Sequence, residues 1–182
     1  MTPAEYWASN QKLQHITPLG ERFPEVNLFP ALQKAIKGSV FEYGCGDGRL
    51  APAFNPDQYV GYDINYSAIK AARLNNPAYQ YTDAHAIGYI YHAYTFLAYT
   101  VLLHVPDYEI ENVIGLAKKY NRIVIGEIMG RQWRRPGNPP VFNRELSEYA
   151  EMIQRPYQVI NVQYPRYGCD LTLAVFDESL RS

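Results

Sequence analysis

A glycine-rich turn is the first feature of this sequence that could do chemistry. After the apolar run Ser39–Tyr43, positions 44–48 read Gly-Cys-Gly-Asp-Gly. Glycine lets a ligand approach the backbone closely and tolerates the positive φ that sharp strand-to-helix turns often need. The amides that open a helix after such a turn present donors and the positive end of the helix dipole. We therefore expect the turn to hold a phosphate or a carboxylate, the alternative being a tight turn with no ligand.

The residues on either side of the turn narrow the choice of ligand. A nicotinamide fingerprint, G-x-G-x-x-G/A, fails when counted from Gly44, because its last position falls on Arg49. A Walker loop fails as well, since no Gly-Lys-Ser/Thr follows. What remains is the pattern E-x-G-x-G-x-G, with Glu42 ahead of the turn.

Two aspartates at the ends of later strands are placed where they could bind an adenosine group. Asp63 ends the second apolar run, about twenty residues after Glu42, where a carboxylate can accept hydrogen bonds from both ribose hydroxyls. Asp83 ends the next short run, in Thr82-Asp83-Ala84, where it could accept a hydrogen bond from an adenine amino group. Each aspartate has a structural alternative, because aspartate also caps helices.

An alternation of strands and helices must position these residues. Helices are predicted at Leu28–Ile36, Ser67–Leu74 and Glu109–Tyr120, the last of them capped by Asp107. Alternation of this kind implies right-handed βαβ crossovers and a doubly wound sheet. The runs that read as buried parallel strands are Ser39–Tyr43, Tyr59–Asp63, Tyr79–Thr82, Thr95–Val101 and Arg122–Glu127.

The end of the chain breaks this alternation. Tyr157–Tyr164 and Leu171–Asp177 both read as strands, and the connection Pro165–Asp170 is too short for a helical crossover. The two runs should therefore pair as an antiparallel hairpin. Alternating units followed by a terminal hairpin point away from most dinucleotide dehydrogenases.

At this point the chain resembles the class I S-adenosylmethionine-dependent methyltransferases, over about Ser39 to Asp177. The resemblance implies an α/β fold: a doubly wound, mostly parallel seven-stranded sheet with a C-terminal antiparallel hairpin. It also implies S-adenosylmethionine as cofactor, with the glycines at the methionyl part, Asp63 on the ribose, Ile64 on the adenine face and Asp83 near adenine. The matching segments read VFEYGCGDG at positions 40–48, GYDI at 61–64, TDA at 82–84 and LLHVPD at 102–107.

The N-terminal segment is a candidate lid. Members of the family often fold such a segment over the methyl donor. Here Tyr6-Trp7 lies in a segment that is predicted to form a short helix ahead of the core. We expect one domain, with residues 1–26 as the lid segment and 27–182 as the core. Docking of this segment onto the core without ligand contact is the alternative. The complete cofactor-binding set predicted is Glu42, Gly44, Gly46, Asp63, Ile64, Asp83, Ala84 and Tyr6.

Residues near the fourth and fifth strand ends are candidates for the acceptor side. Methyl transfer mainly needs alignment and exclusion of water, although a hydroxyl acceptor usually needs a base. Tyr99, Thr100 and His104 follow or end the fourth strand, and Glu127 ends the fifth. Histidine is the side chain with an ordinary pKa near neutrality. The Leu-Leu-His-Val-Pro context of His104 is, however, also a common structural element of the family.

The loop after the fifth strand carries a cationic and aromatic cluster. Positions 130–140 read GRQWRRPGNPP, and Arg131, Trp133, Arg134 and Arg135 stand close together there. These residues, Arg131, Trp133 and Arg134 above all, are predicted to grip an anionic acceptor such as a carboxylate or phosphate. The alternative is a solvated loop.

Composition excludes several classes of protein. The 182 residues are 47% hydrophobic and 19% charged, with a formal net charge of −1, so no broad basic footprint for nucleic acid is expected. No apolar run reaches the roughly 18–20 residues of a membrane helix, and positions 1–10 lack the pattern of a secretory signal. Cys45 and Cys169 are far apart, which predicts neither a disulfide framework nor a metal site. A cytoplasmic location is the simplest expectation.

The leading hypothesis is therefore methyl transfer from S-adenosylmethionine to an oxygen or nitrogen of a small molecule. Methylation of RNA or protein is a second hypothesis. Its nucleic-acid form is disfavoured because positions 98–101 read Ala-Tyr-Thr-Val in place of an Asn/Asp-Pro-Pro-Tyr/Phe tetrapeptide. The third is a binding subunit that has lost turnover, against which the intact turn and Asp63 argue. Oligomeric state is left open.

Overall fold

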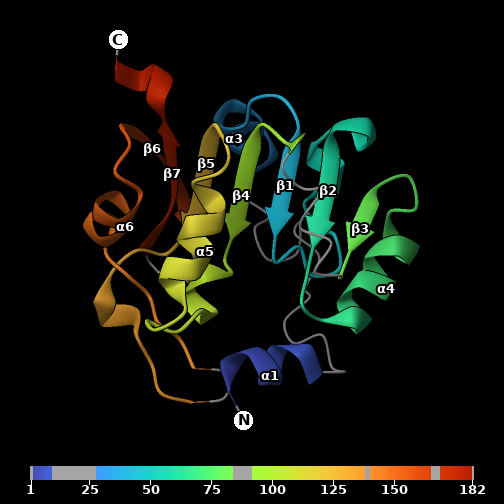
Figure 1. Ribbon diagram of the computed structural model, residues 1–182, viewed down its shortest axis with the longest axis horizontal. Helices are drawn as coiled ribbons and strands as arrows, with labels where there is room; N and C mark the ends of the chain where they lie inside the picture. Colours follow the sequence, from blue (N-terminus) through green and yellow to red (C-terminus); the bar gives the residue numbers. More distant parts are fainter. Residues whose placement is uncertain (1, 10–27, 84–91, 138–139, 165–168, 182) are drawn as a thin grey trace.

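A seven-stranded sheet runs through the centre of the molecule (Figure 1). The structure is a computed structural model that describes residues 2–9, 28–83, 92–137, 140–164 and 169–181. The strand order is β3-β2-β1-β4-β5-β7-β6, with β7 antiparallel to both of its neighbours and the other pairs parallel. The strands are β1 Val40–Tyr43, β2 Tyr59–Tyr62, β3 Gln80–Thr82, β4 Thr95–Tyr99, β5 Arg122–Glu127, β6 Tyr157–Tyr164 and β7 Cys169–Asp177.

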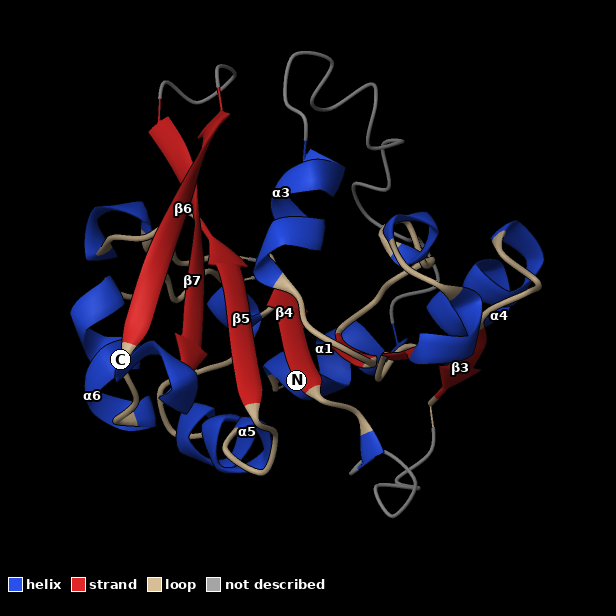
Figure 2. Cartoon of the chain, turned by 90° about the horizontal axis from the view of Figure 1, so that it is seen from above, coloured by secondary structure: helices blue, strands red, loops and turns tan. Residues whose placement is uncertain are grey.

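Helices cover both faces of the sheet (Figure 2). α3 (Leu28–Ala35) and α4 (Tyr66–Asn75) bury Leu32 and Ile69 in the core on one face. α5 (Ile110–Ala117) and α6 (Leu146–Ile153) bury Ile114 and Tyr149 in the core on the other. Every residue of β4 and β5 is buried, as expected for central parallel strands covered on both sides.

The parallel register brings the carboxyl ends of the central strands to one edge. Tyr43, the last residue of β1, pairs with Tyr62 of β2 and with Ala98 of β4. The glycine turn, Asp63 and Thr100 therefore all follow strands that end at this edge. α1 (Pro3–Ser9) lies across the same end of the sheet, below β1 and β4 in Figure 1.

The segment after the glycine turn differs from the expected α-helix. It forms only a 3-10 turn, η1 (Ala51–Ala53), followed by a second, η2 (Pro56–Gln58). Pro52 lies in the first turn, where proline is tolerated, but Pro56 lacks an amide donor and holds Asn55 before it in an extended conformation, so the segment cannot continue as an α-helix. The expectation that a helix dipole supports this turn is therefore wrong, and the donors around it are those of the turn itself.

Two further details around α5 and α6 correct the sequence-based expectations. Asp107 does not cap α5: its carboxylate pairs with Arg134 and Arg144, and the residue that precedes α5 is Glu109, with no side-chain cap. α6 was not expected at all. Its signal was a capping box, in which the Glu145 and Glu148 side chains each accept a hydrogen bond from the other's backbone amide.

The predicted fold class is confirmed. The described strands form the mostly parallel, doubly wound sheet, and the C-terminal pair β6–β7 is the antiparallel hairpin. None of the helices in the described ranges is long and apolar enough to cross a membrane.

A buried ion pair at the amino end of β5 gives a stability prediction. Arg122 donates to the Asp177 carboxylate at 2.5 Å and to the Ala35 carbonyl at 2.6 Å, and both charged side chains are almost fully buried. Arg122→Met should lower the free energy of unfolding by about 3–5 kcal/mol, because it leaves the buried Asp177 charge only the more distant and exposed Lys37, at 3.8 Å. Urea unfolding measures this cost. Arg181→Met, which removes an exposed pair with Glu178, is the control and should cost under about 1 kcal/mol.

Candidate functional site

The glycine turn after β1 has the backbone that its sequence predicts. Gly44, Gly46 and Gly48 all have positive φ, at 77°, 57° and 77°. The amides of Gly44 and Cys45 both donate to the Tyr62 carbonyl, at 2.7 and 2.8 Å, which fixes the start of the turn against the end of β2. The turn is therefore held by backbone hydrogen bonds to its neighbouring strand.

Gly44 and Gly46 differ in what lies around them. A Cβ on Gly44 would come within 2.2 Å of Val101 Cγ2, so packing against the segment after β4 requires glycine there. A Cβ on Gly46 would meet nothing within 4 Å in the described structure. The backbone at Gly46 thus faces open space, into which a ligand can approach closely.

Asp63 joins the end of β2 to this turn. One carboxylate oxygen accepts the Gly46 amide at 2.8 Å, and the other accepts the Asn65 amide at 2.8 Å. Burial raises the pKa of Asp63, and the two amide hydrogen bonds act in the opposite direction. The helix-cap alternative for Asp63 does not hold, because the N-cap of α4 is Asn65, whose side chain accepts the amides of Ser67 and Ala68.

Glu42 lies in the core beneath the turn. Its side chain is only 2% exposed, and one carboxylate oxygen accepts a hydrogen bond from the Tyr59 hydroxyl. Burial raises the pKa of Glu42 to about 7, against the lowering effects of the Tyr59 hydrogen bond and the Arg49 charge. Glu42 is thus placed to support the turn from below and to change its charge near neutral pH.

The predicted adenine side is only partly described. Ile64 follows Asp63 and is 45% exposed, an apolar side chain left uncovered next to the turn. Asp83 lies directly after β3 and is half-buried. Ala84 lies outside the described residues, as does the segment that Asp83 would cap in the structural alternative.

Arg49, the residue that excludes a nicotinamide fingerprint, links the turn to the end of β4. Its guanidinium donates to the Thr100 hydroxyl at 3.0 Å and lies 5.4 Å from the centre of the Tyr99 ring. Thr100 has a φ of 52°, which for a β-branched residue costs roughly 1–2 kcal/mol. Tyr99 itself is 3% exposed, so this predicted catalytic residue lies in the core below the edge.

His104 lies in the 3-10 turn η4 (Leu102–His104), shortly after the end of β4. Its Nδ1 is 3.2 Å from the Pro140 carbonyl oxygen. Its ring lies 4.6 Å, centre to centre, from the Trp7 ring of α1, and Trp7 in turn contacts Tyr6 edge-on at 5.3 Å. The structure therefore brings the predicted lid residues to His104.

Glu127, the other predicted base, has both oxygens bonded within the core. One accepts the Leu103 amide at 2.7 Å and the other the Tyr149 hydroxyl at 2.9 Å, and the side chain is fully buried. Burial raises the pKa of Glu127 to about 7, which these two hydrogen bonds and the Arg144 charge partly oppose.

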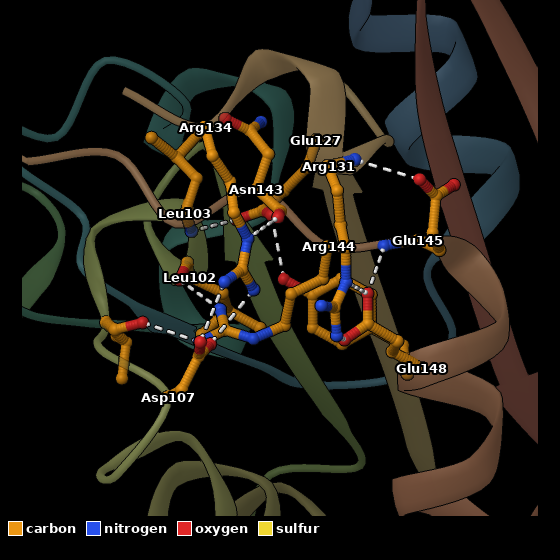
Figure 3. Close-up of polar contacts among 12 residues, drawn as sticks. Leu102, Leu103, Asp107, Glu127, Arg131, Arg134, Asn143, Arg144, Glu145 and Glu148 are labelled. Atoms are coloured by element: carbon orange, nitrogen blue, oxygen red, sulfur yellow. Dashed lines mark hydrogen bonds and ion pairs between the residues drawn. The ribbon is translucent and has the colours of Figure 1, made fainter. Parts of the chain in front are cut away.

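Two of the three arginines in the predicted anion-binding cluster, Arg131 and Arg134, are paired within the protein (Figure 3). Arg131 forms a two-point pair with Glu148, and Arg134 forms another with Asp107 at 2.8 and 3.1 Å. These pairs link the turn η5 (Arg131–Trp133) to α6 and to the segment before α5. Trp133 lies in η5 and is half-buried.

Two buried polar residues in this region were missed by the sequence analysis. Asn143 donates to the Ile128 carbonyl at 2.7 Å, and Arg144 donates to the carbonyls of Leu102 and Val105 at 3.1 and 2.8 Å. Their only signal was a polar pair just before α6, which does not distinguish buried side chains from solvated ones. Among the described residues no cluster of three or more His, Cys, Asp or Glu side chains could hold a metal ion.

Comparison with known proteins rests on structure, since no family profile and no curated protein matches this sequence. A possible histamine N-methyltransferase from Thermotoga maritima superposes with a TM-score of 0.64 at 13% identity, over 82% of this chain and 86% of that one. The magnesium protoporphyrin IX methyltransferase of Synechocystis, with bound S-adenosylmethionine, gives 0.61 at 14% identity, over 82% and 74%. The chain has the class I methyltransferase fold.

A third structure with this methyltransferase fold contains two different bound small molecules. It is the 1,6-didemethyltoxoflavin-N1-methyltransferase of Burkholderia thailandensis, with bound 1,6-didemethyltoxoflavin and S-adenosylhomocysteine, at a TM-score of 0.62 and 14% identity, over 82% of this chain and 76% of that one. At identities this low, the superpositions establish the fold of the present chain and nothing about its ligands. Which ligands it binds has to be argued from its own residues.

Substitution of the two glycines should separate packing from backbone strain. Gly44→Ala places a methyl group inside Val101 and should cost more stability than Gly46→Ala, which pays only the left-handed backbone term of roughly 1–2 kcal/mol. Urea unfolding of the two variants measures the difference. Equal costs would contradict the packing of Gly44 against Val101.

The raised pKa of Glu42 predicts a pH dependence of stability. The folded state holds the Glu42 proton more tightly than the unfolded chain does, so the free energy of unfolding falls as pH rises from about 4.5 to about 7. Glu42→Gln removes this contribution, and the variant should gain stability relative to the wild type across that window. Urea unfolding of both proteins across the window tests this, and a difference that stays constant with pH would refute it. Glu127 contributes to the wild-type slope in the same direction and is unchanged in the variant.

Proposed function

We propose that this chain transfers a methyl group from S-adenosylmethionine to an oxygen or nitrogen atom of a small-molecule acceptor. The observation that carries the proposal is the hydrogen bond from the Gly46 amide to the Asp63 carboxylate, at a glycine turn whose outer side is open. This hydrogen bond lies at the carboxyl ends of the parallel strands. Solved structures with the same fold include proteins with bound S-adenosylmethionine and S-adenosylhomocysteine.

The residues present fit this cofactor. The uncovered backbone at Gly46 gives the methionyl part a surface without a Cβ, and Gly44 holds the turn in place. A carboxylate oxygen has more than one lone pair, so Asp63 can keep its amide bonds and still accept from a ribose hydroxyl. In the proposal the exposed Ile64 side chain covers one adenine face, with Asp83 and Ala84 near the adenine edge and Glu42 supporting the turn.

The division of labour follows from the chemistry of the donor. The sulfonium of the bound cofactor makes its own methyl group electrophilic, so the chain needs to bind, align and exclude water. Tyr6 and Trp7 of α1 are assigned to the lid over the edge. An imidazole can accept a proton from a hydroxyl acceptor, and we assign this task to His104. Tyr99 supports Arg49 and Thr100 from within the core.

The acceptor side is shaped by paired charges. Arg131 and Arg134 each engage a carboxylate of the protein through two N–H groups, so the charge of each is already balanced by a carboxylate of the chain. We therefore assign Arg131 and Arg134 to shaping the loop around a small-molecule acceptor and Trp133 to contacting it with its ring.

Binding of the cofactor and its product tests the proposal directly. Asp63→Ala should weaken binding of S-adenosylmethionine and S-adenosylhomocysteine by about 1–3 kcal/mol, because it removes the ribose acceptor and the anchor of the Gly46 amide. Isothermal titration calorimetry measures both ligands. Asp57→Ala, at the exposed amino-end side of β2, is the matched control and should bind like the wild type.

The possible results of this titration, together with an assay of turnover, bear on the proposal in different ways. No binding of either ligand below millimolar concentration by the wild type would refute the proposed function, and so would unchanged affinity in Asp63→Ala. Binding without turnover on any acceptor would favour the alternative of a binding subunit. Weakened binding in Asp63→Ala but not in Asp57→Ala is the expected result.

A further inference from the structure

The backbone of one short turn is held by two buried charged side chains. Glu127 accepts the Leu103 amide at 2.7 Å from one side. Arg144 donates to the carbonyls of Leu102 and Val105, at 3.1 and 2.8 Å, from the other. Glu127 is 0% exposed and Arg144 is 2% exposed. Figure 3 shows Glu127 and Arg144 beside Leu102 and Leu103 of η4, and the third residue of this turn is His104.

Further hydrogen bonds complete this anchoring. The Phe142 amide donates to the Leu103 carbonyl at 2.6 Å, so both polar backbone atoms of Leu103 are bonded. Glu127 is itself held by the Tyr149 hydroxyl at 2.9 Å, and Arg144 by the Asp107 carboxylate at 2.7 Å. β5, α6 and the segment before α6 thus converge on one turn of the chain.

Such an arrangement is an expensive way to stabilise a fold. Taking an ionisable group out of water is unfavourable, which for Glu127 is seen in its raised pKa, and well-packed apolar side chains often give equal or greater stability. In some proteins buried polar or charged groups fix a particular geometry, and functional side chains need supporting hydrogen bonds that hold them in place. Here the geometry that they fix is that of the backbone around His104.

The environment of His104 shows what this precision affects. Its Nδ1 lies 3.2 Å from the Pro140 carbonyl oxygen, which can only accept a hydrogen bond, so that bond requires a proton on Nδ1. The ring also contacts Trp7 of α1. A shift of η4 would change the imidazole's distance from Pro140, and with it the tautomer and orientation of the ring.

We propose that Glu127 and Arg144 are positioning residues that hold the His104 imidazole, in its Nδ1-protonated form, at the methyl-acceptor side of the site. Neither is assigned contact with the substrate: each acts through the backbone of η4. The functional importance of His104 rests on the proposed function. For Glu127 the inference replaces the role of general base with one that uses both of its carboxylate oxygens.

The test reads the tautomer of His104 in the full chain. Long-range nitrogen–proton NMR distinguishes the two neutral tautomers, and His104→Gln identifies the signal among the four histidines. The wild type should show the Nδ1-protonated form. Arg144→Met and Glu127→Leu should lose it, whereas Glu127→Gln should retain it, because an amide can accept from Leu103 and donate to the Tyr149 oxygen.

Arg122→Met is the control for a merely structural effect. Like Arg144, Arg122 is a buried arginine that bonds a backbone carbonyl and a carboxylate. It lies in β5, at the end of the strand opposite to Glu127. The substitution should destabilise the protein comparably yet leave the His104 tautomer unchanged. If Arg144→Met or Glu127→Leu does not fold, Tyr149→Phe removes only the hydroxyl that holds Glu127 and should give a partial loss.

An unchanged tautomer in the folded Arg144→Met and Glu127→Leu variants would overturn the inference. An unchanged tautomer in Tyr149→Phe would do so if those two variants cannot fold, and an equal change in Arg122→Met would do so in any case. S-Adenosylhomocysteine titrated into the same samples separates the two proposals. Wild-type protein that fails to bind it refutes the proposed function, while the tautomer result still decides the roles of Glu127 and Arg144.

Discussion

The parallel pairing of β1 with β2 and β4 determines where the polar groups of this molecule meet. Because the three strands run in the same direction and end in register, the segments that follow them emerge at one edge. The glycine turn can then use the Tyr62 carbonyl and the Asp63 carboxylate as partners, and Arg49 can reach Thr100. A reversed β2 would carry Asp63 to the far end of the sheet.

Two glutamates in the core support the two halves of this edge in similar ways. Glu42 lies under the glycine turn and is bonded by Tyr59 of β2, whereas Glu127 lies under η4 and is bonded by Tyr149 of α6. Burial raises the pKa of both to about 7. Each carboxyl therefore combines a structural role with an ionisation equilibrium near neutral pH, and the two halves of the site share a sensitivity to protonation.

The sequence predicts the fold well because its signals are local. Strand runs, the terminal hairpin, and the spacing from Glu42 to Asp63 all depend on short-range pattern. The pairing of long side chains depends instead on which loops meet in space. Nothing local distinguishes Arg131 and Arg134, which pair with Glu148 and Asp107, from arginines that await a ligand.

The same limit explains the residues that were missed or misassigned. Asp107 precedes a helix and reads as its cap, but two arginines distant in sequence bind it instead. Arg144 reads as a surface residue, because only the folded chain shows that β5, η4 and α6 enclose it. Pro56 was a local signal that could have shown the helix after the glycine turn to be too short.

Thr100 carries a consequence for how this protein could change. Glycine at this position would relieve the left-handed backbone and stabilise the folded state, although it would also remove the hydroxyl that Arg49 binds. The native threonine thus lowers the stability of the folded state but provides a defined contact between the glycine turn and the end of β4. Selection for heat resistance alone would favour glycine here. The glycine turn and the segment after β4 would then lose the hydrogen bond between Arg49 and Thr100 that connects them.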